Sequence, residues 1–237
     1  MSMKEMMAGM LLLSLAACSD GAPQAMNKGG GQENGAAQNV AADAVPANAP
    51  IIVAFGDSLY AGYGVQQDQG FAPELQRALA ARGVVARVHN AGVSGDTTAA
   101  GLARLAFTLD GLPKAPALAL VGLGGNDMLR GLPAAQTRSN LDAILTELDR
   151  RNIPVVLTGM MASPNMGAEY VAAFNPIFPD LARAHHATLY PFFLDGVVGH
   201  AELIQADGIH PNEAGVDVVI ARMVPAITPA VTEALQP

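Results

Sequence analysis

Pro50-Ile51-Ile52-Val53-Ala54-Phe55-Gly56-Asp57-Ser58-Leu59 is the stretch around which this chain is organised. Its five consecutive apolar residues, rich in β-branched types, predict a strand buried on both faces, which is typical of the centre of a parallel sheet. Gly56 ends the run, and an acidic residue, Asp57, and a serine, Ser58, follow it. Ligand sites in open α/β sheets lie outside the carboxyl ends of such strands. Ser58 stands at such an end, although alone it reads more simply as a turn residue.

Strand and helix patterns alternate along the rest of the chain. Further strands are expected at residues 84–89, 117–123, 153–158 and 188–193. Helices are expected at residues 71–82, 97–109, 134–151 and 169–186, with a last one capped by Asn212 and burying Val216, Val219, Ile220 and Met223. This alternation predicts an α/β fold with a parallel sheet of five strands.

The amino-acid composition of the chain limits the classes of function that it can have. The 237 residues are 51% hydrophobic and 14% charged, so the chain can bury a core. The net charge is −8 and there are three lysines, Lys4, Lys28 and Lys114, so the basic surface needed to bind a nucleic-acid backbone is not expected. The single cysteine, Cys18, excludes an intramolecular disulfide.

The first residues have the layout of an export signal. Residues 1–17 are apolar after Lys4, and are too short to span a bilayer as a helix. Leu15-Ala16-Ala17-Cys18 resembles the bacterial lipobox, which implies cleavage before Cys18 and lipidation of its sulfur. An ordinary cleavage site beside a chance cysteine is the simpler alternative. Ser19 after the cysteine is similar to the signal for sorting to the outer membrane, so we expect a protein anchored in the bacterial cell envelope on the periplasmic side.

Residues 18–49 are rich in Gly, Ala, Asn and Gln and have no apolar periodicity. Such a segment buries too little to fold and predicts a flexible linker that begins at the lipidated Cys18. The folded domain is then expected at residues 50–237, a normal size for one domain.

Reactive residue types follow successive strands of the predicted sheet. Ser58 follows the first strand, Gly95 the second and Asn126 the third, while Asp207 and His210 lie between the fifth strand and the last helix. All five therefore project from the same edge of a parallel sheet. Each alone has a plain reading as a turn, a cap or a solvated side chain, and only their convergence indicates a site.

Together these residues satisfy the needs of acyl transfer. Ser58 offers a hydroxyl nucleophile and His210 a base. Asp207, three residues earlier, can reach the Nδ1–H of His210 across a tight turn and fix the tautomer that leaves Nε2 free. The side chain of Asn126 and the backbone N–H of Gly95 can donate to a developing oxyanion.

The same residues carry a family resemblance. Four blocks, in order along the chain, resemble the consensus blocks of the SGNH (GDSL) hydrolase family: Gly56-Asp57-Ser58-Leu59, Gly95, Gly124-Gly125-Asn126-Asp127 and Asp207-Gly208-Ile209-His210-Pro211. Ser94-Gly95-Asp96-Thr97 and Phe174-Asn175-Pro176-Ile177-Phe178-Pro179 are similar to the branch that contains acyl-CoA thioesterase I, lysophospholipases and arylesterases. Four ordered blocks are specific, whereas a lone Gly-Asp-Ser is not.

The resemblance implies a flavodoxin-like three-layer α/β/α fold and hydrolysis of fatty-acyl or aryl esters and thioesters by Ser58, His210 and Asp207, without a metal or another cofactor. It implies an oxyanion hole made of the N–H groups of Ser58 and Gly95 and the side chain of Asn126. A protein in the cell envelope does not meet cytosolic acyl-CoA, which favours lysophospholipids or other small esters. No protein partner is expected.

Two other functions remain open at this stage. A metal-dependent phosphoesterase also has acidic blocks after its strands, but the chain lacks the Asp-x-His and Asn-His-Asp/Glu motifs of that class. A lipoprotein that uses the fold only for binding is the second alternative. The G-x-S-x-G elbow of α/β-hydrolases is absent. The loop containing Met160, Met161 and Met166 is expected either to line an acyl groove or simply to pack in the core.

Overall fold

The structure is a computed structural model that describes residues 45–236. The predicted signal peptide at residues 1–17, Cys18, and the predicted linker as far as residue 44 lie outside the described residues. The predicted catalytic domain is described almost completely.

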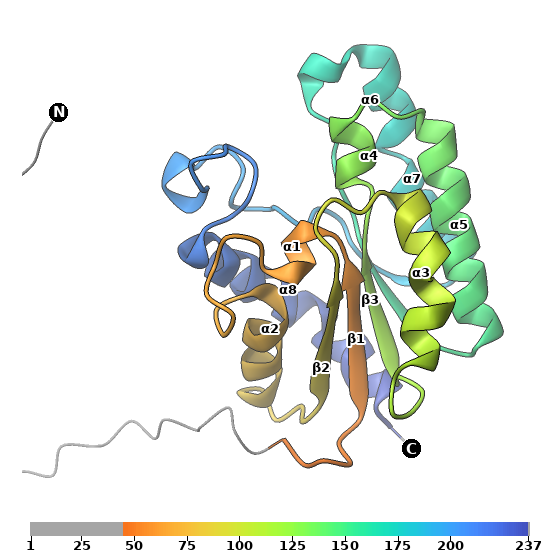
Figure 1. The fold of residues 1–237 in the computed structure, drawn as a ribbon, viewed down its shortest axis with the longest axis vertical. Coiled ribbons are helices and arrows are strands. Elements are labelled where there is room, and N and C mark those ends of the chain that lie inside the picture. The colour runs from red at the N-terminus through yellow and green to blue at the C-terminus, as the bar shows by residue number, and fades with distance from the viewer. Residues whose placement is uncertain (1–44, 237) are drawn as a thin grey trace, which may run out of the picture. The chain divides into compact units, whose positions relative to one another are not determined.

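A five-stranded parallel sheet forms the middle layer of the domain, with the strand order β2-β1-β3-β4-β5 (Figure 1). Its strands are β1 (Ile51–Gly56), β2 (Arg87–Gly92), β3 (Leu118–Gly122), β4 (Val155–Thr158) and β5 (Thr188–Tyr190). Every residue of β1, β3 and β4 is buried, because helices cover both faces of the sheet there. The expectation of a parallel five-stranded sheet is confirmed.

Helices cover the two faces of the sheet (Figure 1). The helices are α1 (Ser58–Ala61), α2 (Phe71–Ala80), α3 (Thr98–Asp110), α4 (Gly125–Leu129), α5 (Ala134–Arg150), α6 (Ala168–Phe174), α7 (Ile177–Ala184) and α8 (Glu213–Ala234). One outer layer pairs α2 with α8, and the other packs α3 and α7 against α5. The result is the three-layer α/β/α fold.

The last helix, α8, follows the sequence pattern closely. The Asn212 side chain caps it by accepting the backbone N–H of Gly215 at 3.0 Å. Its predicted apolar face is buried, with Val216, Val219 and Met223 at most 5% exposed. By length and mean hydropathy, 1.5 over its most apolar part, α8 would suffice to cross a membrane. Its packing against α2 and β5 instead makes it a core helix.

Four expectations on the elements are wrong. The fifth strand, expected at residues 188–193, ends at Tyr190. The helix expected at residues 169–186 is two helices, α6 and α7, because Asn175 and Pro176 interrupt it. The second strand runs at Arg87–Gly92, three residues later than expected, because it pairs with β1 from Ile51 to Gly56. The short helices α1 and α4 were not expected, since four or five residues are too few to show a helical period.

Glycines end the three neighbouring strands β1, β2 and β3. Gly56 pairs with Gly92 on one side and with Gly122 on the other. A Cβ at Gly122 would lie 2.2 Å from the ring of Tyr60, and one at Gly92 would lie 2.2 Å from the backbone N of Ala61. The missing side chains therefore let α1 lie directly on the carboxyl edge of the sheet.

Candidate active site

Ser58 is the first residue of α1 and is 8% exposed. Tyr60, two residues later, is buried beneath the helix, where its hydroxyl lies 2.9 Å from Thr158 Oγ1 and its ring packs against Phe71 and Phe193. This anchor fixes α1 on the sheet. Because the first backbone N–H groups of a helix have no partner within it, the amide of Ser58 is available to a ligand.

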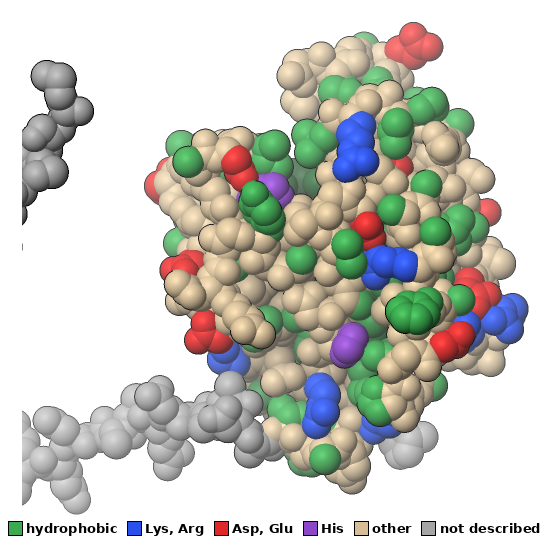
Figure 2. All heavy atoms as spheres, in the orientation of Figure 1, with side chains coloured by type: hydrophobic (Ala, Val, Ile, Leu, Met, Phe, Trp, Pro, Cys, Tyr) green, Lys and Arg blue, Asp and Glu red, His purple; other side chains and the backbone are tan. Residues whose placement is uncertain are grey.

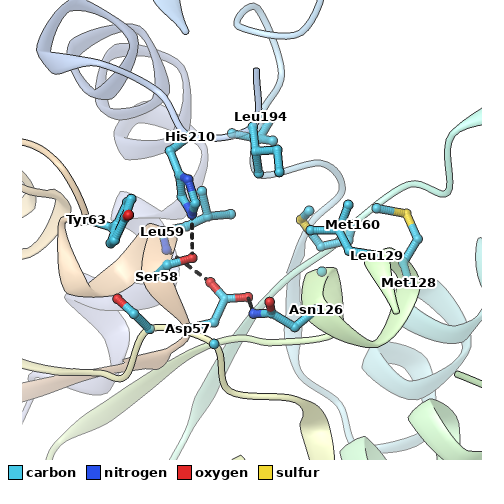
Figure 3. Close-up of a pocket in the computed structure, with 14 residues that line it drawn as sticks. Asp57, Ser58, Leu59, Tyr63, Asn126, Met128, Leu129, Met160, Leu194 and His210 are labelled. Carbon is cyan, nitrogen blue, oxygen red and sulfur yellow. Dashed lines mark hydrogen bonds between the residues drawn. The ribbon is translucent and has the colours of Figure 1, made fainter. Parts of the chain in front are cut away.

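His210 and Asp207 come from the loop between β5 and α8. His210 Nε2 lies 2.8 Å from Ser58 Oγ (Figure 3). On the other side of the ring, His210 Nδ1 lies 2.6 Å from Asp207 Oδ2. The backbone N–H of His210, its side chain and the backbone N–H of Ile209 together lower the pKa of Asp207 to about 2. The carboxylate therefore stays charged and holds the histidine tautomer in which Nδ1 carries the proton.

The two expected donors lie across the site from His210. Asn126 is in the first turn of α4, and its Nδ2 donates to the backbone oxygen of Asp96 at 2.9 Å. Gly95 has a φ of +86°, a conformation that favours glycine. Ser58, Gly95 and Asn126 line one cavity, so the structure brings together all five residues predicted for the site.

Two arginines hold the loop that contains Gly95. Arg104 donates to Asp96 Oδ2 at 2.6 Å and to the backbone oxygen of Gly56 at 2.9 Å, which ties this loop to the end of β1. Arg130 donates to the backbone oxygen of Gly95 at 2.7 Å. The position of the Gly95 amide is therefore set by side chains that sequence reasoning did not single out.

Asp127, next to Asn126, is fully buried and holds three elements together. Its carboxylate accepts the backbone N–H of Thr98 at 2.8 Å and the hydroxyl of Thr98 at 2.5 Å, both at the start of α3. It also accepts the hydroxyl of Thr137 in α5 at 3.3 Å. Three hydrogen bonds compensate its burial and fix α4, and thus Asn126, against α3 and α5.

Asp57 is buried beside the nucleophile. Its Oδ1 caps α1 by accepting the N–H of Leu59 at 3.0 Å, and its Oδ2 lies 3.4 Å from Asn126 Nδ2. Burial raises the pKa of Asp57 to about 6, although the bond from Leu59 opposes the shift. The expected turn-shaping role of Asp57 takes the form of a helix cap.

An apolar cavity of about 270 Å³ opens beside Ser58 (Figure 3). Its apolar lining residues are Leu59, Tyr63, Met128, Leu129, Met160, Leu194 and Ile209. Of the methionines in the loop after β4, Met160 lines the cavity whereas Met161 and Met166 do not. The space-filling view shows a hollow beside the purple ring of a histidine, with apolar side chains around it (Figure 2).

Sequence reasoning did not identify Tyr63 and Gln205. The ring of Tyr63 lies against the ring of His210, with 4.6 Å between centroids, and Gln205 bridges backbone groups on both sides of the site. The glycine-rich context of Tyr63 was the only signal. Within residues 45–236, no three His, Cys, Asp or Glu side chains gather in the manner of a metal site.

A family comparison matches the described domain. The sequence model of the GDSL-like Lipase/Acylhydrolase family matches residues 54–218. The chain is 39% identical over 183 residues to Esterase TesA of Pseudomonas aeruginosa, an alignment that covers 77% of this chain and 90% of that protein. It is 37% identical over 166 residues to Thioesterase 1/protease 1/lysophospholipase L1 of Escherichia coli K12, covering 70% of this chain and 77% of that protein.

Solved structures agree in fold. The crystal structure of AlinE4, described as an SGNH-hydrolase family esterase, is 50% identical and superposes with a TM-score of 0.67, covering 80% of this chain and 98% of that one. The three-layer α/β/α fold of this chain therefore agrees with that of a solved SGNH-hydrolase family esterase.

Proposed function

Because this chain belongs to the GDSL-like lipase/acylhydrolase family and is a serine esterase of it, we propose that Ser58 is its nucleophile, His210 its base and Asp207 the group that orients the base. The alternatives of a metal-dependent phosphoesterase and of a binding protein without activity are not favoured by these relationships. The observation that carries the proposal is the continuous pair of hydrogen bonds from Ser58 Oγ through His210 to Asp207, 2.8 and 2.6 Å long.

In the first half of the reaction, Ser58 Oγ attacks the carbonyl carbon of the ester while His210 Nε2 takes the hydroxyl proton. The imidazolium that forms is stabilised by Asp207, whose carboxylate remains charged because its pKa is about 2. His210 then gives this proton to the leaving alcohol as the C–O bond breaks, leaving an acyl group on Ser58.

In the second half, water attacks the acyl group and His210 again accepts and returns one proton, which releases the acid and restores Ser58. The negative charge of each tetrahedral intermediate falls on the former carbonyl oxygen. Ser58, Gly95 and Asn126 line the cavity beside the nucleophile, which supports the proposal that the two N–H groups and the Asn126 Nδ2 donate to this oxygen. Asn126 can donate there by giving up its long, 3.4 Å contact with Asp57.

The cavity favours an apolar acyl or aryl group. Its lining includes no lysine or arginine, so a strongly anionic leaving group gains no ion pair from it. Relatives carry the names arylesterase and lysophospholipase. We therefore place small aryl esters and lysophospholipids before acyl-CoA as substrates.

Substitution of the nucleophile tests the proposal. We expect Ser58→Ala to lower kcat by roughly 10⁴-fold or more on p-nitrophenyl esters and on a lysophospholipid, because the covalent route is lost while the remaining site persists. The matched control is Ser139→Ala, an exposed serine of α5, which should keep wild-type turnover. EDTA should leave the activity of the wild-type protein unchanged. Substantial turnover by Ser58→Ala, with an unchanged circular dichroism spectrum, would overturn the mechanism.

A further inference from the structure

Two loops from distant parts of the chain meet over the nucleophile. One follows α1 and contains Tyr63 and Gly64, and the other contains Gln205, Asp207 and His210. The Gln205 side chain joins them, because its Nε2 donates to the backbone oxygen of Tyr63 at 2.8 Å and to that of Pro211 at 2.9 Å. The backbone N–H of Gln205 also donates to the backbone oxygen of His210 at 2.8 Å.

The bridge made by Gln205 is needed because Asp207 cannot hold the loop of His210 at a fixed distance from Ser58. Asp207 stands three residues from His210 in the same loop, so it sets the orientation of the imidazole within that loop. It does not set the distance between that loop and Ser58, which lies 152 residues earlier in the chain. Among the hydrogen bonds of residues 45–236, the bond from Gln205 Nε2 to the Tyr63 carbonyl is the one that makes this connection, apart from the reacting bond between His210 and Ser58.

Tyr63 completes the contact on the other side of the ring. Its ring centroid lies 4.6 Å from that of His210, with the planes tilted by 40°. In Figure 3 the labelled Tyr63 lies beside Ser58 and His210, on the side away from Met160 and Leu129. An aromatic face attracts a cation, so the ring stabilises the imidazolium more than the neutral imidazole.

The local backbone is shaped to admit this bridge. Gly62 ends α1 with a φ of +78°, which turns the chain towards the second loop. Gly64 has a φ of +74°, and a Cβ there would lie 2.1 Å from Gln205 Oε1. The absence of a side chain at Gly64 is therefore what allows the Gln205 amide to reach the Tyr63 carbonyl.

We propose that Gln205 and Tyr63 are positioning residues, which hold His210 at the distance from Ser58 that proton transfer requires and stabilise the imidazolium formed there. The inference rests on the proposed function of Ser58 and His210. A displacement of about 1 Å in such a site costs on the order of 100-fold in rate. The effect of Gln205 belongs in kcat, because Gln205 does not line the cavity that receives the substrate, whereas Tyr63 does.

The first test uses Gln205. We expect Gln205→Ala and Gln205→Glu both to lower kcat by roughly 10- to 100-fold on a p-nitrophenyl ester, with KM within about twofold, because neither new side chain donates to the two carbonyls. Gln136→Ala, an exposed glutamine of α5, is the matched control and should behave as wild type. Thermal unfolding of each variant shows whether the domain stays folded. Wild-type kcat in Gln205→Ala would overturn the bridge.

The second test separates a chemical role of Tyr63 from a structural one. Tyr63→Leu should lower kcat severalfold, since the imidazolium formed in the reaction loses its aromatic neighbour. Tyr63→Phe keeps the ring and should restore the wild-type kcat. Wild-type kcat in Tyr63→Leu would overturn this part. If Ser58→Ala is inactive while these variants match wild type, the positioning proposal fails and the catalytic one stands.

Discussion

At the scale of single residues, Asp57 is a carboxylate whose pKa is raised by its burial. It is 4% exposed and lies beside a second acid, Asp96, and the amide of Asn126. Asp57 also lines the cavity beside Ser58. Burial disfavours the charged form of Asp57, but the same side chain is retained as the cap of the helix that carries Ser58.

The raised pKa of Asp57 makes stability depend on pH. The pKa is about 6 in the folded protein against a usual value of 3.8, so folding favours the protonated form. The stabilisation is complete below about pH 4 and is lost as the pH rises through 6. We expect Asp57→Asn, which keeps a capping oxygen, to gain up to about 3 kcal/mol relative to wild type between pH 4 and 8. Urea unfolding across this range measures the difference.

Asp207 provides the contrast for this measurement. Its pKa is lowered to about 2, so its contribution is present above about pH 4 and lost as the pH falls through 2. Asp207→Asn should therefore lose stability relative to wild type as the pH rises from 2 to 5, the opposite slope. A parallel wild-type and Asp57→Asn stability curve would show that burial of Asp57 does not control its ionisation.

At the scale of elements, the sequence predicted what is periodic and missed what is short or contacts at a distance. The long helices and the buried strand Ile51–Gly56 were recognisable because their apolar residues repeat or run together. Pro176 was visible as a break in the expected helix at residues 169–186, but the apolar spacing outweighed it. The shift of β2 has another cause, since its register depends on pairing with β1 rather than on its own residues.

The residues of the candidate site were only partly predictable from the sequence. Ser58, Gly95, Asn126, Asp207 and His210 could be proposed because parallel strands bring their carboxyl ends to one edge. Gln205 could not, since its role is a contact with a backbone carbonyl 142 residues away, which no local pattern records. The burial of Asp57 was equally hidden, because it depends on how α1 seats on the strand-end glycines.

His185 connects two helices in a pH-dependent way. It ends α7, and its ring nitrogens lie 2.6 Å from Asp149 and 2.9 Å from Asp142, both in α5. Burial alone would lower the pKa of His185, but the hydrogen bonds to Asp149 and Asp142 outweigh it and raise the pKa. The ion pairs of protonated His185 with Asp149 and Asp142 therefore stabilise the fold below about pH 6.5. This stabilisation is lost as the pH rises through the raised pKa of His185.

We expect His185→Gln to flatten the loss of stability that wild type shows between about pH 6 and 8, measured as the urea midpoint at each pH. His200→Gln is the matched control, because the side chain of His200 is 55% exposed and its neighbour Glu202 is 71% exposed. If His185→Gln keeps the wild-type slope of stability against pH, the pH dependence arises from other groups in the molecule.

At the scale of the whole molecule, the described domain contains every group used in the proposed reaction, whereas Cys18 lies outside it. Attachment to a membrane and catalysis should therefore be separable. We propose that Cys18 carries the acyl chains, and we therefore expect Cys18→Ala to move the protein from the membrane fraction to the soluble fraction, with kcat/KM within about twofold of wild type. Ser14→Ala keeps the cysteine and serves as control. Unchanged membrane association of Cys18→Ala would refute lipidation.

The 152 residues between Ser58 and His210 also set the order in which activity can arise during synthesis. The nucleophile leaves the ribosome early, and at translation rates of about 5–20 residues per second its base follows roughly 10–30 s later. Until the loop that carries His210 docks, the serine is an ordinary alcohol. A nascent chain is therefore expected to lack esterase activity until the loop that carries His210 has been made and has docked on Ser58.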